Sequence, residues 1–197
     1  MISCECIGQC KYVLAPALAA LAIFVLGFIY WGLPPHLAYK DLSSVADDSA
    51  TALAIGKMFP TTGIYMMPSP LLGEEKMNEL SARGPMVEVH ITKEPFTGAD
   101  MGKCMALGFL HMFVLCVLLS FILCGLAKSF ERWTCRVKFC AAIGLLVVAG
   151  DLGYAIWWHH SLAWTLAQSF YDFATYLVAG LVLGKLLTPK PASAPAT

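Results

Sequence analysis

The chain has 197 residues, of which 58% are hydrophobic and only 13% are charged. This composition excludes an ordinary soluble domain, in which about 25% of the residues are charged. Thirteen basic and thirteen acidic residues leave no net charge, so the composition does not indicate binding to nucleic acid or to an acidic partner.

Four apolar runs are long enough to cross a bilayer core of about 30 Å as helices that rise ~1.5 Å per residue. They lie at residues 12–33, 103–126, 138–158 and 162–187. The first run is longer than the apolar region of a signal peptide, so it is interpreted as a retained helix. The runs predict an all-α transmembrane four-helix bundle, with a Cys-rich N-terminus at residues 1–11 and a disordered, Pro-rich tail at residues 188–197.

Residues 34–102, between the first and second spans, carry nine acids and five bases. They are too polar for the membrane and predict a small α+β insertion of two helices and two strands. Because a two-stranded sheet is marginal alone, it is expected to pack on the helices, the membrane surface or a partner. The expected elements are a helix capped by Asp41, Ser43 or Ser44 and ending near Lys57, a strand at 64–67, a helix at 74–83 and a strand at 86–92.

The basic residues predict the orientation of the spans. They gather in the short connection at residues 127–137 and flank the first and fourth spans, so these segments and both termini are expected to be cytoplasmic. The α+β insertion is then extracytoplasmic. Its lack of cysteines and of a glycosylation sequon fits a bacterial inner membrane. The basic residues are Lys11, Lys128, Arg132, Arg136, Lys138, Lys185 and Lys190; the tryptophans expected at the outer interface are Trp31, Trp157, Trp158 and Trp164.

Several short motifs resemble a family of small uncharacterised bacterial four-span inner-membrane proteins. The insertion contributes a Gly-Ile-Tyr strand at 63–65, a Gly-Pro at 84–85 and a Met-Gly at 101–102. The last two spans contribute a Trp-rich turn and a Phe-Tyr-Asp-Phe segment at 170–173. The resemblance covers most of the chain and implies the same topology, but no activity.

Three ionisable residues, His111, Asp151 and Asp172, lie inside the apolar runs. Such residues are costly in a membrane and often mark a proton or ligand site. Counted from the turn at 159–161, both acids fall at similar depth, and two carboxylates in one apolar site cannot both ionise easily. His111 is the only cationic partner expected at that depth. Gln168 and Tyr176 share the polar face of the fourth span with Asp172, so they are further proton or ligand candidates.

A structural reading stands beside this one. The same polar side chains can form hydrogen bonds that fix the register of packed helices, and Gly180 and Gly184 continue their face as a Gly-x-x-x-Gly that permits close packing. His111 alternatively suits haem or a chlorophyll magnesium. Five cysteines are zinc candidates with non-standard spacing, and reduced or lipid-modified thiols are the simpler reading. No cofactor is predicted. The cysteines are Cys4, Cys6, Cys10, Cys135 and Cys140.

The leading functional expectation is a non-enzymatic scaffold or accessory subunit of a larger membrane complex. It would contact the lipid bilayer and other membrane subunits, or a second copy of itself, through the insertion and the Gly180–Gly184 face. The first alternative is a proton-coupled transporter or ion-conducting protein that uses Asp151, Asp172 and His111. The second is a redox or pigment-associated subunit.

Overall fold

The computed structural model describes residues 9–32 and 47–188, and their side chains from residue 13 onward. The chain forms two compact units, one made of residues 1–40 and 102–197 and the other of residues 41–101. The N-terminal cysteines Cys4 and Cys6 and the tail from 189 onward lie outside the described residues. The two units are taken in turn below.

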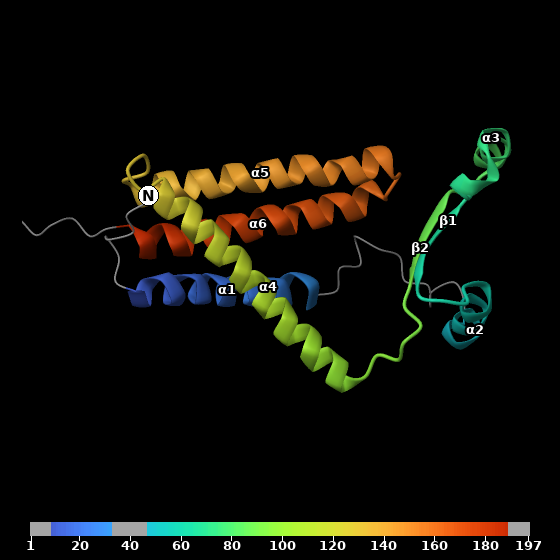
Figure 1. The fold of residues 1–197 in the computed structure, drawn as a ribbon, viewed down its shortest axis with the longest axis horizontal. Helices are drawn as coiled ribbons and strands as arrows, with labels where there is room; N and C mark the ends of the chain where they lie inside the picture. Colours follow the sequence, from blue (N-terminus) through green and yellow to red (C-terminus); the bar gives the residue numbers. More distant parts are fainter. Residues whose placement is uncertain (1–8, 33–46, 189–197) are drawn as a thin grey trace, which may run out of the picture. The chain divides into compact units, whose positions relative to one another are not determined.

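The first unit is built from four long helices: α1 (Gln9–Gly32), α4 (Gly98–Gly125), α5 (Trp133–Trp157) and α6 (Leu162–Leu187). Each is long and apolar enough to cross a membrane, so the chain is a multi-pass membrane protein, as the hydropathy predicts. The short turn between α5 and α6 makes them an antiparallel hairpin, and α1 packs on α6. α4 crosses the other three obliquely (Figure 1).

The core of this unit is a seam of small and apolar residues. From α1 it takes Ala15, Ala19, Ala20 and Ile23, and from α6 it takes Ala179, Leu183 and Leu187. The fully buried residues of α4 all fall between Cys116 and Leu123, and partly buried residues from Phe109 onward also pack against the core. The bundle is therefore a packed three-helix arrangement that a fourth helix crosses.

Aromatic side chains join α1 to α6 at the end of the bundle where α1 ends, here called the tryptophan end. The Tyr30 hydroxyl donates to the carbonyl of Ala167 at 2.9 Å. The rings of Trp31 and Trp164 lie 5.7 Å apart. The opposite end, where α5 begins and α4 and α6 end, is here called the basic end, because Lys128, Arg132, Arg136, Lys138 and Lys185 belong to it.

Two helices begin earlier than the apolar runs do. α4 begins at Gly98 instead of 103, because Thr97 and Asp100 bond reciprocally across its first turn, as in a capping box. α5 begins at Trp133 instead of 138, so Arg136 and Lys138 belong to the helix and not to the predicted loop. Hydropathy detects the lipid-immersed part of a helix, whereas capping decides where it starts.

The second unit contains the expected two helices and two strands. They are α2 (Asp48–Met58), β1 (Gly63–Met67), a short 3-10 turn η2 (Pro70–Leu72), α3 (Glu74–Arg83) and β2 (Val87–Ile91). The strands pair antiparallel, with Tyr65 opposite Val89. Asp41, Ser43 and Ser44 lie outside the described residues. The described α2 is capped instead by Asp47, whose carboxylate accepts from the amide of Ala50 at 2.7 Å.

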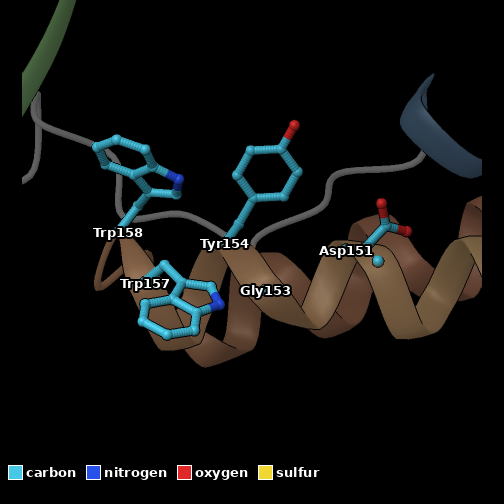
Figure 2. A pocket seen from close by; sticks show the side chains of 6 residues that line it. Asp151, Gly153, Tyr154, Trp157 and Trp158 are labelled. Atoms are coloured by element: carbon cyan, nitrogen blue, oxygen red, sulfur yellow. The ribbon is translucent and has the colours of Figure 1, made fainter.

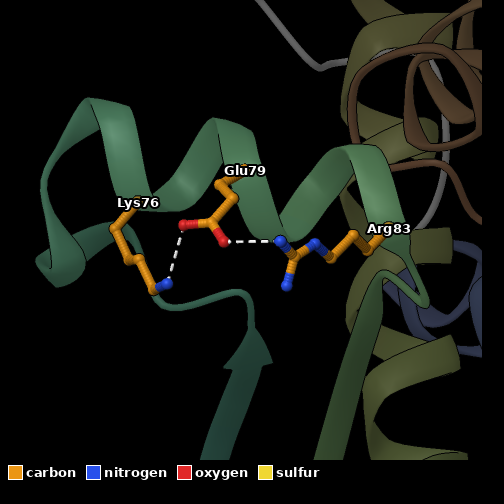
Figure 3. A network of polar contacts seen from close by, with 3 residues as sticks. All are labelled: Lys76, Glu79 and Arg83. Atoms are coloured by element: carbon orange, nitrogen blue, oxygen red, sulfur yellow. Dashed lines mark hydrogen bonds and ion pairs between the residues drawn. The ribbon is translucent and has the colours of Figure 1, made fainter.

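No residue of helix α3 is buried, and two ion pairs lie along its surface. Glu79 accepts from Lys76 at 2.7 Å and from Arg83 at 2.9 Å (Figure 3). Exposed pairs at this spacing contribute only about 0.3–0.5 kcal/mol each. The helix matches its predicted bounds because Gly73 and Gly84, both with positive φ, stand at its two ends.

Candidate functional site

The α5–α6 hairpin brings the two intramembrane acids together. Asp151 comes from the last third of α5 and Asp172 from the first half of α6, and both side chains are half-buried. Their carboxyl groups are close enough to interact directly, and the buried hydroxyl of Ser169 faces Asp151. Two carboxylates this close repel each other unless they share a proton.

The two acids have different surroundings. Gln168 donates from Nε2 to Oδ2 of Asp172 at 3.0 Å, an i,i+4 contact on one face of α6. The buried Oδ2 of Asp151 accepts no hydrogen bond from any described residue. Ionised Asp172 thus has a donor, whereas ionised Asp151 lacks one at that oxygen. This asymmetry favours a proton on Asp151.

Asp151 also borders a cavity of about 480 Å³ that lies toward the tryptophan end. Asp151 and Tyr154 project to the same side of α5 there, while Trp157 lies on another side (Figure 2). The space is wide open and lies along the surface of α5, so Asp151 is not sealed inside the bundle. Its lining consists of Gly150, Asp151, Gly153, Tyr154, Trp157 and Trp158.

Tyr176 connects the acids with the cavity that contains His111. Its side chain lies near enough to Asp151 and Asp172 for their charges to act on it, and it also lines a cavity of about 400 Å³ beside α4. His111 stands in the wall of the same cavity, but its side chain is exposed. Within the described part of the chain no ion pair joins His111 to either acid. His111, which the sequence predicts as the cationic partner of the acids, is therefore not in contact with them through an ion pair. It shares a cavity wall with Tyr176.

The polar face of α6 continues from Asp172 toward the start of the helix, where it includes Thr165 and Ser169. Thr165 and Ser169 are buried at 3% exposure each, and neither hydroxyl has a hydrogen-bond partner at close range among the described residues. Side chains whose only role is to fix helix register normally bond across the interface. Of these two hydroxyls, that of Ser169 faces Asp151, so the polar face of α6 extends to the acid pair.

Gly180 and Gly184 lie on the face of α6 that packs against the first turns of α5. A Cβ added at Gly180 would lie 2.7 Å from the Cβ of Cys140, and one at Gly184 would lie 3.1 Å from the carbonyl oxygen of Trp133. The two glycines thus permit the close approach of α5. The role in helix packing that the Gly-x-x-x-Gly spacing predicts is seen here within the chain, where α5 covers both glycines.

Of the five candidate cysteines, only Cys135 and Cys140 have described side chains, and these two do not converge. The backbone of Cys10 belongs to α1, but its side chain lies outside the described residues. Cys135 is half-buried on α5 and Cys140 is buried against Gly180. Residues five apart on a helix point in different directions. In the described segments no three His, Cys, Asp or Glu side chains gather as they would around a metal ion.

One residue with an unexpected environment is Arg136, which the sequence places in a solvated basic loop. It is 1% exposed and is the largest of the fully buried side chains. The missed signal was the apolar pattern of Phe139, Cys140 and Ile143, which extends back toward it along one face of α5.

A scan against protein-family models finds no match, and searches of curated proteins and of solved structures find none either.

Proposed function

We propose that this protein conducts protons across a membrane, with Asp151 and Asp172 as its proton-binding pair. The observation that carries the proposal is that an antiparallel helix pair turns two intramembrane carboxyl groups toward each other. Such a pair holds one proton more readily than none. Intramembrane acids that face a bundle interior commonly serve as proton relays.

The surroundings of the pair support a path for the proton. Asp151 borders the cavity at the tryptophan end, and Tyr176 stands between the acids and the second cavity, which contains His111. A phenol and an imidazole both donate and accept protons. In this proposal a proton moves from Asp151 to Asp172 and then by way of Tyr176 and His111.

We further propose a bacterial inner-membrane location, with both termini in the cytoplasm and residues 41–101 outside. The concentration of lysine and arginine at the basic end supports this orientation, because such residues are retained on the cytoplasmic side. The aromatic residues Trp31 and Trp164, which meet at the other end, fit the outer interface.

Proton flux into proteoliposomes tests the proposal. Vesicles that contain a trapped pH-sensitive dye and the purified full chain should acidify when a pH gradient is imposed. Asp172→Asn should lower the rate more than about tenfold, since proton-relay groups contribute factors of this order or larger. Glu75→Gln, which removes an exposed acid of α3, is the matched control and should leave the rate unchanged. Absence of flux with the parent protein would reject the proposal.

A second candidate is an accessory subunit of a membrane complex. The observation that favours it is the exposed position of His111 on a lipid-facing helix, because polar side chains in a membrane normally face protein or water. A photo-reactive residue at position 111 should then crosslink to one defined neighbour or to a second copy in native membranes. The same residue at Leu146, which is 73% exposed on α5, is the control. Equal crosslinking from both positions would exclude a specific partner at His111.

A further inference from the structure

Arg136 is a buried cation without an anion among the described residues. It is 1% exposed, and its Nε donates to the carbonyl oxygen of Phe130 at 3.0 Å. Its Nη1 is buried and has no hydrogen-bond partner in the described ranges, nor does any described carboxylate form an ion pair with it. A guanidinium stays charged under all ordinary conditions. Burying it without a counter-charge is strongly unfavourable.

The guanidinium points toward the start of its own helix. Arg136 is the fourth residue of α5, and Phe130, which accepts its hydrogen bond, precedes that helix. Helical side chains lean toward the N-terminus, which makes this contact natural. The N-cap residue, Arg132, gives the helix no side-chain cap. The positive end of the helix dipole and a buried cation therefore lie together, and both attract an anion.

The neighbouring side chains add to the positive charge. Lys185 of α6 lies over the ring of Trp133, with its Nζ 5.3 Å from the ring centre. Arg132 and Lys138 are exposed on either side of Arg136 along the chain. The described acid nearest in sequence, Glu131, is exposed. The arrangement therefore suits a ligand with at least one full negative charge.

We propose that Arg136 and the first turn of α5 bind the phosphate group of an anionic phospholipid at the basic end of the bundle. A guanidinium fork matches the oxygens of a phosphate better than an ammonium does. The site lies where a membrane span ends, at the level of lipid headgroups, and the indole of Trp133 is typical of that level. The proposal does not depend on proton transport.

Nη1 has no open path to solvent in this structure. A phosphate therefore reaches Nη1 only when neighbouring side chains are displaced. The side of Arg136 that faces α6 has no room for such a displacement, because its Cβ packs close to Gly184. The displacement must occur toward the connection between α4 and α5, which carries Phe130.

Lipid binding to the full chain in neutral detergent tests the site, with native mass spectrometry as the readout. Three probes are compared: phosphatidylglycerol, phosphatidylcholine and inorganic phosphate. The parent should retain phosphatidylglycerol, and Arg136→Gln should weaken that binding by about tenfold, the value of one charged hydrogen bond. Lys57→Gln, which removes an exposed positive charge from α2 and lies outside the proposed site, is the matched control and should leave the binding unchanged. Phosphatidylcholine and inorganic phosphate should bind weakly to all forms.

A conservative variant keeps the test valid if Arg136→Gln does not fold. Arg136→Lys retains the charge but loses the fork, so it should bind phosphatidylglycerol several-fold more weakly than the parent. The added lipid should raise the melting temperature of the parent more than that of this variant. Unchanged phosphatidylglycerol binding in both Arg136 variants would overturn the proposal. Equal retention of inorganic phosphate would overturn the assignment to a lipid.

Discussion

At the residue scale, the asymmetry of the acid pair has a chemical consequence. Asp172 accepts from Gln168, whereas Oδ2 of Asp151 has no donor among the described residues, so the shared proton should reside on Asp151. Hydrophobic carbodiimides react with protonated carboxyl groups. We expect such a reagent to modify Asp151 in preference to Asp172, as read by peptide mass spectrometry. Asp151→Asn should abolish the modification, and preferential labelling of Asp172 would contradict the assignment.

A second residue-scale prediction concerns Glu94 in the small unit. Its carboxylate accepts from the hydroxyl of Thr62 at 2.8 Å, and that hydroxyl accepts from the amide of Lys93 at 3.0 Å. These bonds join the two ends of the β1–β2 hairpin. The bond from Thr62 is the main cause that lowers the pKa of Glu94 below its ordinary value.

A lowered pKa in the folded chain means that ionised Glu94 stabilises the hairpin. The stabilisation is complete above the ordinary glutamate pKa of about 4.3 and is lost as the pH falls through the lower, folded pKa. Thr62→Val should return the pKa of Glu94 toward the ordinary value. Carbon-detected NMR titration of the side-chain carboxyl measures this, with Glu94→Gln for assignment. An unchanged midpoint in Thr62→Val would show that the bond does not control the ionisation.

At the scale of elements, the α5–α6 contact depends on glycines that allow close approach. Gly180→Ala should destabilise the chain by about 1–3 kcal/mol, as overpacked cores do, because the new methyl group would meet Cys140. Gly150→Ala in α5 is the control. No atom lies within 4 Å of its added Cβ, so it should be neutral or stabilise the helix by up to about 1 kcal/mol. Denaturant titration in detergent, followed by circular dichroism, distinguishes the two variants.

The same helices show which features of the fold can be predicted from sequence. Length and hydropathy are local properties, so the four spans were predictable, and α3 was predicted with its bounds because glycines stand at both ends. The oblique path of α4 was not predictable, because it depends on which few side chains reach the core. The burial of Arg136 was missed for a related reason: a charge in a first helical turn can lean into a core that hydropathy does not describe.

The candidate site was predictable only in part. A turn of known length fixed the relative height of Asp151 and Asp172, and the structure turns them toward each other. The sequence could not place His111, because its distance from the acids depends on the angle of α4. It also could not show that α5 would occupy the Gly180–Gly184 face, since small residues pack equally well within a chain or between chains.

At the scale of the whole molecule, the proposed orientation places the α+β unit and the basic end on opposite sides of the membrane. In a cysteine-free background, a cysteine at the exposed position Asn78 of α3 should react with a membrane-impermeant maleimide added to intact spheroplasts. A cysteine at the exposed position Lys128 should react only after lysis. The reversed pattern would invert the topology. Reaction of both positions in intact spheroplasts would show that α4, the one long helix between them, does not cross the membrane.

Because α4 packs on the other helices along only part of its length, the thickness of the surrounding bilayer should change its tilt and thereby the position of His111. Its 28 residues correspond to about 42 Å of helix, more than a hydrocarbon core of about 30 Å, and its buried residues lie only between Cys116 and Leu123. No described residue of α4 before Phe109 packs against the core, so the helix will incline further in a thin bilayer and stand more upright in a thick one. Acyl-chain length should thereby adjust the gap between His111 and Tyr176 without any change in the protein itself.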